Sequence, residues 1–124
     1  MKKKTKKTAN KTQLRKKLDV AWSIAVKDRA NNKCEVCGKA TYLNSHHIVG
    51  RRNLALRWEI FNGVCLCSGC HTFKTNSAHQ NPLWFDEWLK NNRNDDVVLC
   101  KNSMSDIKKW TLEGMRDKLC ELKL

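Results

Sequence analysis

The sequence predicts an α+β domain in which a small zinc-stabilised ββα unit is flanked by N-terminal and C-terminal helices. The chain has 124 residues, enough for one modest core but not for a second domain of ordinary size. Two C-x2-C pairs, Cys34/Cys37 and Cys67/Cys70, bracket a segment with two short apolar runs typical of strands. On either side of this segment, apolar residues recur at helical spacing.

The first helix is predicted over residues 12–30, where the apolar pattern ends at Asn31 and Asn32. Its apolar positions are Leu14, Leu18, Ala21, Trp22, Ala25 and Val26. The segment before Leu14 is rich in Lys, Thr and Asn and has almost no apolar surface to bury. We therefore expect residues 1–13 to be a basic disordered tail and residues 14–124 to form one domain.

The ββα unit is predicted in the middle of the chain. Residues 41–49 and 64–67 are expected to be short strands, and residues 50–62 a polar, basic loop between them. A helix is expected to begin near Ser68 and to end at about Ser77.

The C-terminal third is predicted to hold two helices and one more strand. Asn81-Pro82 places proline in the first turn of a helix. The apolar face of that helix is Trp84, Phe85, Trp88 and Leu89. Residues 97–100 are expected to be a short strand, and residues 103–106 fit a capping box ahead of the last helix. The apolar positions of the last helix are Leu112, Met115, Leu119 and Leu122.

Most of the five tryptophans are expected to pack in the core, because they lie on apolar helix faces. These four are Trp22, Trp84, Trp88 and Trp110. Trp58 lies instead in the basic loop, where it could either pin the loop to the core or contact a ligand.

Charge and composition point to nucleic acid as the partner. Lysine and arginine total 25 against 12 acidic residues, which gives a formal net charge of +13. One surplus lies in residues 1–17 and a second in residues 39–74, the segment that also holds the cysteines and histidines. Basic segments bind phosphate backbones through counterion release, although the tail could also be a simple solubilising arm.

A membrane or secreted protein is not expected. No apolar run approaches the roughly 18 residues that span a bilayer, and Met1 is followed by lysines and not by the apolar stretch of a signal peptide. The cysteines number seven, which is odd for a disulfide framework. We therefore expect a cytoplasmic protein whose closely spaced cysteines bind metal.

The two C-x2-C pairs are predicted to bind one structural Zn²⁺. Two residues between thiolates let both sulfurs of a turn reach a tetrahedral ion at about 2.3 Å. Gly38 follows the first pair and suits the positive φ that such turns often need. Cys65 is expected to face away from the ion, although it could replace Cys67 as a ligand. Cys100 and Cys120 are expected to be small buried apolar residues.

A structural zinc site made of four cysteines does not require the histidines of this segment. His46 and His47 end the first predicted strand, and His71 opens the following helix. Imidazoles are the usual metal ligands and the usual general bases near neutral pH. Two adjacent histidines at the end of a strand and a third opening a helix can supply a ligand pair and a base around one phosphate.

The order of these residues resembles the HNH endonucleases, particularly the small phage-encoded type with a ββα-metal motif. The resemblance covers residues 34–77 and does not extend to the flanking helices. It is carried by Cys34-x2-Cys37, His46-His47-Ile48, Arg51-Arg52-Asn53, Asn62-Gly63-Val64-x-Leu66-Cys67 and Cys70-His71.

The resemblance implies a metal-dependent DNA endonuclease that hydrolyses phosphodiester bonds by nicking, double-strand cleavage or both. It places one catalytic divalent metal, Mg²⁺, Mn²⁺, Ni²⁺ or Zn²⁺, on His46 and His71. It makes His47 the general base and Asn62 the residue that holds the loop and orients the base. Histidine in place of aspartate at position 46 favours Mn²⁺, Ni²⁺ or Zn²⁺ relative to Mg²⁺. His79 could add a further contact to the metal.

The resemblance also implies DNA as the partner, held through its phosphates by Arg51 and Arg52. It suggests a phage terminase or another DNA-processing protein as a further partner. A monomer is favoured, and weak sequence specificity is expected because no second DNA-reading module is visible. Two alternatives stay open, a non-catalytic zinc-dependent module that binds nucleic acid and an accessory subunit of a phage DNA-processing machine.

Overall fold

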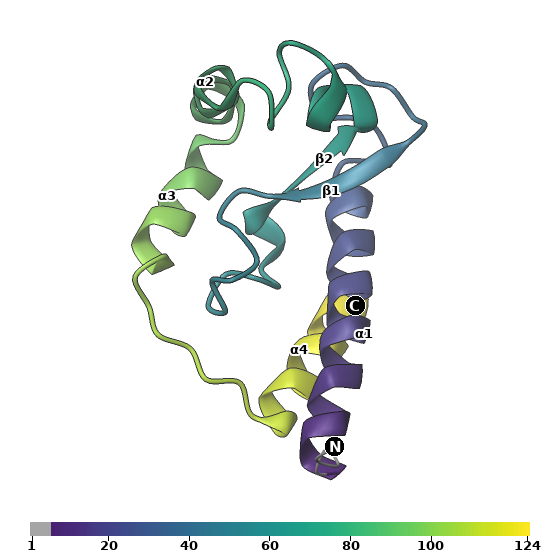
Figure 1. Ribbon diagram of the computed structural model, residues 1–124, viewed down its shortest axis with the longest axis vertical. Coiled ribbons are helices and arrows are strands. Elements are labelled where there is room, and N and C mark those ends of the chain that lie inside the picture. The colour runs from purple at the N-terminus through teal and green to yellow at the C-terminus, as the bar shows by residue number, and fades with distance from the viewer. Residues whose placement is uncertain (1–5) are drawn as a thin grey trace, which may run out of the picture.

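The computed structural model describes residues 6–124, and their side chains from residue 10 onwards. It contains a two-stranded sheet and four α-helices, which confirms the predicted α+β class (Figure 1). The helices are α1 (Lys6–Arg29), α2 (Pro82–Asn92), α3 (Asn94–Ser103) and α4 (Leu112–Lys123). The strands are β1 (Leu43–His47) and β2 (Gly63–Cys67), with the short helical turns η1 (Ile60–Asn62) and η2 (Gly69–Phe73) on either side of β2.

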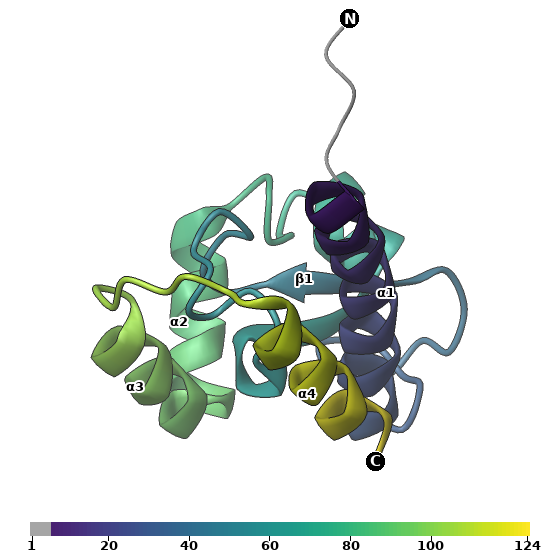
Figure 2. The same cartoon turned by 90° about the horizontal axis from the view of Figure 1, so that it is seen from below.

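The two strands are antiparallel and lie at the centre of the molecule. Leu43 pairs with Cys67 at one end of the sheet, and His47 pairs with Gly63 at the other. α1 and α4 lie side by side, with α2 and α3 on the other side of the strands (Figures 1 and 2). The sheet is therefore covered on both faces, and every residue of β2 is buried.

Each face of the sheet has its own apolar core. Toward α1 and α4, the buried residues are Leu18, Ala21, Trp22, Val26, Trp58, Cys65, Met115 and Leu122. On the other side they are Cys34, Val64, Leu66, Cys67, Cys70, Ala78, Phe85 and Leu89. Successive residues of a strand point to opposite faces, so Val64 and Leu66 enter the second core and Cys65 enters the first.

The N-terminal helix is longer than predicted. It begins at Lys6, so residues 6–13, expected to be disordered, are helical in the structure, and the first five residues of the predicted tail lie outside the described part of the chain. The helix predicted over residues 68–77 is instead the single turn η2, which ends where Lys74 takes an extended conformation. The chain then folds back on itself, and Ala78 N–H donates to the carbonyl of Cys70 at 2.9 Å.

The strand predicted over residues 97–100 is wrong, because this segment lies inside α3. Cys100 is buried and Val97 half-buried, whereas Val98 and Leu99 are about half exposed, which is the period of a helix and not of a strand. Asp95 and Asp96 in the first turn of α3 suit the positive end of the helix dipole.

The predicted capping box at residues 103–106 does not start the last helix. The N-cap of α4 is Thr111, whose hydroxyl accepts the N–H of Gly114 at 3.0 Å. Residues 104–111 connect α3 to α4, and Ile107 in this connection is almost fully exposed. Cys100 is buried as predicted, but Cys120 lies on the exposed side of α4, where burial falls on Met115 and Leu122.

Trp58 pins the loop between the strands to α1. Its side chain is 1% exposed, and its indole N–H donates to the Asp19 carboxylate at 2.8 Å. The ring of Trp110 packs edge-on against it, with 5.2 Å between ring centroids. The role of Trp58 in fixing the loop is therefore confirmed.

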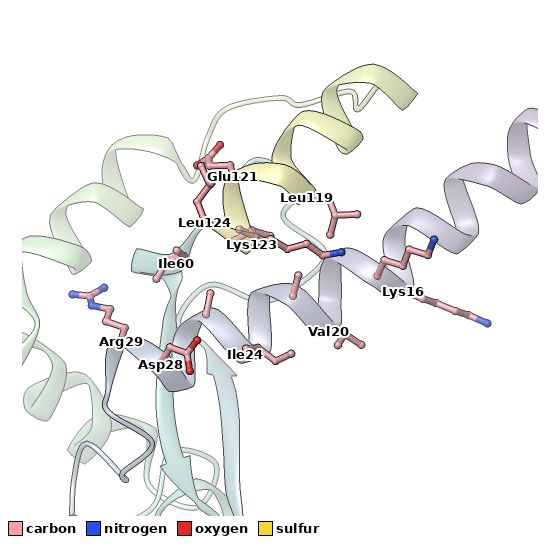
Figure 3. A pocket seen from close by; sticks show the side chains of 14 residues that line it. Lys16, Val20, Ile24, Asp28, Arg29, Ile60, Leu119, Glu121, Lys123 and Leu124 are labelled. Atoms are coloured by element: carbon pink, nitrogen blue, oxygen red, sulfur yellow. The ribbon is translucent and has the colours of Figure 1, made fainter.

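An open groove of about 1030 Å³ runs between α1 and the C-terminal turn of α4 (Figure 3). Its apolar lining includes Val20, Ile24, Ile60, Leu119 and Leu124. None of the described helices is both long and apolar enough to cross a membrane.

Candidate functional site

Four thiols converge beside the end of the sheet. The Sγ atoms of Cys34, Cys37, Cys67 and Cys70 all lie within 4.8 Å of one another, and the Cys37 and Cys67 sulfurs are 3.6 Å apart. Four sulfurs at about 2.3 Å from a tetrahedral ion would be separated by about 3.8 Å, so the cluster fits Zn²⁺. Cys65 is not part of it, because its side chain packs in the core against α1.

Local backbone turns bring each cysteine pair together. In the first pair, the N–H of Gly38 donates to the carbonyl of Cys34 at 2.8 Å, and Gly38 has a φ of 79°, which glycine adopts readily. In the second pair, the N–H of Cys70 points at the sulfur of Cys67 at 3.4 Å. The C-x2-C spacing thus sets the geometry within each pair, and the bond from the Glu35 N–H to the Cys65 carbonyl, at 2.9 Å, holds the two pairs next to each other.

The electrostatics of the cluster favour a bound cation. Burial acts to raise the pKa of the Cys67 thiol, but hydrogen bonds from the Cys70 amide and the Cys37 thiol lower it to about 7. Burial raises the pKa of Cys70, whose sulfur lies 3.7 Å from the Lys74 ammonium. Thiols held this close can all ionise only if a cation replaces their protons.

Three imidazoles form a second cluster, on the face of the sheet turned toward α2. Nitrogen atoms of His46, His71 and His79 lie within 4.8 Å of one another, and the Nε2 atoms of His71 and His79 are 3.0 Å apart. The ring of His46 packs edge-on against Phe85 of α2, with 5.3 Å between centroids. Three imidazole nitrogens at this spacing can hold one divalent metal ion.

His79 is a member of this cluster that the sequence pattern indicates only weakly. Eight residues separate it from His71, which would be about two turns of a continuous helix. The helical turn η2 stops after Phe73, and the returning chain places the N–H of His79 3.1 Å from the carbonyl of His71. The return brings the two rings together, with 4.7 Å between their centroids.

The two half-buried members of the cluster, His46 and His71, have lowered pKa values, and the cluster is open on one side. Burial and the neighbouring His71 and His79 lower the pKa of His46 to about 3, and burial also lowers the pKa of His71. Neutral rings keep the lone pairs that a metal needs. His79 is exposed, so a metal held by three protein ligands would have a coordination position facing solvent. An all-nitrogen set suits Zn²⁺, Ni²⁺ or Mn²⁺ better than Mg²⁺.

His47 points to the opposite face of the sheet from His46, toward α1. One ring nitrogen, Nε2, lies 2.9 Å from the carbonyl of Arg57. In the neutral ring Nε2 carries the proton for this bond, which leaves Nδ1 free to accept one. Burial lowers the pKa of His47, an effect partly opposed by the Arg57 carbonyl and by Asp19. The ring is therefore held as a neutral base, apart from the three-histidine cluster.

Asn62 closes the loop between the strands. It is fully buried, its Oδ1 accepts the N–H of Val49 at 2.7 Å, and its Nδ2 donates to the carbonyls of Val49 and Leu56 at 3.0 Å. Because Leu56 precedes Arg57, these bonds also fix the carbonyl that holds His47. One amide side chain thus ties both ends of the loop to the base.

The arginines of the loop fall into two groups. Arg51 and Arg52 are exposed on the turn that follows Gly50, and Arg51 lies close enough to lower the pKa of His47. Arg57 is instead held by Asp19 through two bonds of 3.1 and 2.8 Å. Of these three cations, the first two face solvent and are available to an anion.

Arg93, which the sequence pattern does not single out, links the cysteine cluster to the strands. It is 8% exposed, and its guanidinium donates to Glu35 at 2.8 Å, to Asp96 and to the carbonyl of Gly63 at 3.0 Å. Glu35 in turn accepts the N–H of Cys65 at 2.7 Å. A lone arginine between two helices carries no pattern by which sequence reasoning could recognise this role.

Comparison with known proteins agrees with this geometry. The family model described as HNH endonuclease matches residues 34–77, the segment that holds both cysteine pairs, His46, His47, Asn62 and His71. Comparison with curated proteins and with solved structures gives no match. His79 and the four α-helices lie outside the matched segment. Residues 34–77 therefore match the HNH endonuclease family model and carry a cysteine cluster suited to zinc, and this match suggests a nuclease or nucleic-acid-binding function.

Proposed function

We propose that the protein is a metal-dependent DNA endonuclease that hydrolyses phosphodiester bonds. The observation that carries the proposal is that three of its four histidines cluster, whereas the fourth lies apart from them. Three imidazoles converge on one point, and the fourth, His47, is held separately as a base at the end of β1, next to His46. A module that only binds nucleic acid has no need for this arrangement.

His47 acts as the general base. With Nε2 held by the Arg57 carbonyl, Nδ1 takes the proton of the attacking water, and the lowered pKa keeps the ring neutral at physiological pH. Asn62 holds the loop that carries this carbonyl, so its part is to position the base and not to react.

His46, His71 and His79 bind the catalytic metal, and the four cysteines bind a structural Zn²⁺. A divalent metal ion on the three imidazoles would supply Lewis-acid stabilisation of the charge that develops on the phosphate. The half-buried setting of His46 and His71 strengthens that electrostatic effect relative to bulk water.

DNA lies against the exposed loop that follows β1. Arg51 and Arg52 there bind phosphate oxygens, and both belong to the basic surplus of residues 39–74. Since no base-reading element is recognisable, the contacts are to the backbone, and affinity should fall steeply with salt.

Cleavage of supercoiled plasmid tests this proposal. Protein stripped of loosely bound metal, with one zinc per chain verified by mass spectrometry, is supplied with Mg²⁺, Mn²⁺, Ni²⁺ or Zn²⁺. We expect nicked or linear plasmid with Mn²⁺, Ni²⁺ or Zn²⁺, and loss of cleavage in His47→Ala with DNA binding kept. Asn44→Ala, three residues earlier on the same strand, is the control and should cleave like the wild type.

One result of the same experiment would contradict the proposal. A folded, zinc-loaded protein that shifts DNA but cleaves it with none of the four metals would leave the binding module or the accessory subunit as its function.

A further inference from the structure

α1 lies outside the HNH segment, yet one of its side chains contacts the proposed base directly. The indole of Trp22 stacks on the imidazole of His47, with 3.8 Å between centroids and 6° between ring planes. We propose that Trp22 is a positioning residue that holds the His47 ring in the orientation required of the base. This inference rests on the proposed function, because it concerns the same site.

The indole is itself fixed in place. Trp22 is 3% exposed, and its Nε1–H donates to the carbonyl of Glu59 at 2.8 Å. Glu59 belongs to the loop that also carries Arg57, the hydrogen-bond partner of His47. The loop therefore orients both the indole and the imidazole, and the stacked pair cannot rotate without breaking one of these bonds.

The residue opposite His47 makes room for this contact. Gly63 pairs with His47 across the sheet, and a Cβ at Gly63 would lie 2.8 Å from Cζ2 of Trp22 and 2.3 Å from Cγ2 of Val26. Any side chain at position 63 would push α1 away from the strands. Glycine here allows α1 to approach closely enough for the indole to reach the imidazole.

A second residue of α1 fixes the other contact of the base. Asp19 binds the Arg57 side chain through two hydrogen bonds and accepts the indole N–H of Trp58 at 2.8 Å. These bonds hold the loop at the residue whose carbonyl accepts from His47. α1 thus supports the base twice, through the ring face at Trp22 and through the loop at Asp19.

Kinetics of Trp22→Leu and Trp22→Phe test the role. Leucine keeps apolar volume but gives no flat support, so kcat should fall about 10- to 100-fold, the cost of misplacing a reacting group. KM, DNA affinity and zinc content should stay within about twofold of the wild type, because the substrate and metal contacts are untouched. Phenylalanine restores a ring and should recover most of the lost kcat.

Trp110→Leu is the matched control. Trp110 is also an indole packed beside the loop, and its N–H also donates to a loop carbonyl, that of Leu54 at 3.0 Å. Its ring stacks edge-on against Trp58 and not against His47. Its loss should lower stability with little change in kcat, which separates positioning from general support of the core.

An NMR measurement tests the contact without any cleavage. Ring current from Trp22 should move the His47 ring-proton signals upfield in the wild type and in Trp110→Leu, and the displacement should vanish in folded Trp22→Leu. His47 signals that are the same in the wild type and in Trp22→Leu, or a Trp22→Leu protein that cleaves at the wild-type rate, would overturn the role of Trp22. Neither result would affect the proposed function. If the wild type fails to cleave DNA with every one of the four metals, the proposed function is overturned, and with it any catalytic role for Trp22.

Discussion

The two clusters of metal-binding side chains lie close together yet differ in construction. Three of the four cysteines are at most 3% exposed, and the four sulfurs form a closed set with no position left for a further ligand. The other cluster has three histidines, two half-buried and one exposed, so a metal bound there would have a coordination position open to solvent. Closed four-ligand sites stabilise folds, whereas open sites carry chemistry. The same short segment of chain thus holds one cluster suited to each task.

The clusters also differ in what holds their ligands. Each cysteine pair is set by its own tight turn, and the fold has only to bring the two pairs together across a separation of 30 residues between Cys37 and Cys67. The histidines come from β1, from η2 and from the returning chain before α2, and they meet only when the domain is folded. Changes at the cysteines should therefore affect the whole fold, and changes at the histidines mainly the site.

The largest effect is expected from Cys67→Ala. Structural zinc contributes on the order of 10 kcal/mol to folding in small domains, so loss of one buried ligand should leave the chain largely unfolded at 25 °C. Circular dichroism melts and zinc content would measure this. Cys120→Ala, which changes an exposed cysteine outside the cluster, should keep both values at wild-type levels. A cooperatively melting, zinc-loaded Cys67→Ala would mean that the cluster is not a structural zinc site.

Arg93 links the segment of the first cysteine pair to the strands, and its loss should have the next largest effect. Arg93→Met removes the only cation paired with Glu35 in the described part of the chain and leaves Asp96 with Arg29 alone, and it should destabilise the fold by about 3 kcal/mol, the cost of breaking a buried ion pair. Denaturant unfolding would measure it. Arg29→Met is the control, because Arg29 pairs with Asp96 from a side chain that is 42% exposed and should cost about 1 kcal/mol or less. Equal losses in the two variants would contradict the structural role of Arg93.

The sequence predicts the cysteine cluster better than the histidine cluster, because the spacing within each cysteine pair is local. Ligand spacing within C-x2-C is local, so four cysteines and one turn glycine suffice to identify that site. His79 reaches His71 only because the chain turns back after η2, and the return leaves no periodic signal. Trp22 and Arg93 act through contacts across the fold, which a single sequence does not display.

Secondary structure was likewise predictable where the signal is local and was missed where contacts across the fold matter. Long amphipathic helices were predictable from apolar spacing at α1, α2 and α4, although α1 begins earlier and α4 starts at a different cap. Residues 97–100 are four apolar residues in a row, a pattern that fits a strand or a helix equally well. In the structure these residues are helical, and the helix packs Cys100 into the core beside Asn62, with the thiol 3.4 Å from Oδ1.

His71→Ala should break only the open cluster. Two imidazoles bind a divalent ion far more weakly than three, so affinity for Mn²⁺ or Ni²⁺ at this site should fall at least about 100-fold. Isothermal titration on zinc-loaded protein would measure it, with Asn76→Ala on the neighbouring loop as the control. The midpoint of thermal unfolding should move by only a few degrees. Unchanged affinity would show that the three histidines do not bind the metal.

The smallest effect expected is a pH dependence specific to the histidine cluster. Burial and the neighbouring His71, His79 and His47 lower the pKa of His46 from 6.5 to about 3, so the unfolded chain takes up a proton before the folded one does. Stability should therefore be lost as the pH falls through 6.5 toward 3, by about 1 kcal/mol between pH 7 and 5.5 for this group without added metal.

His46→Gln isolates this contribution, because both proteins keep the cysteine cluster and its own proton dependence cancels between them. The difference in unfolding free energy between wild type and variant should shift by about 1 kcal/mol over that pH range, with the wild type losing more. Added Ni²⁺ should suppress the shift, since a bound metal competes with the protons for the same lone pairs. A difference that stays constant with pH would mean that His46 is as accessible to protons in the folded state as in the unfolded chain, and that the cluster is not preformed for a metal.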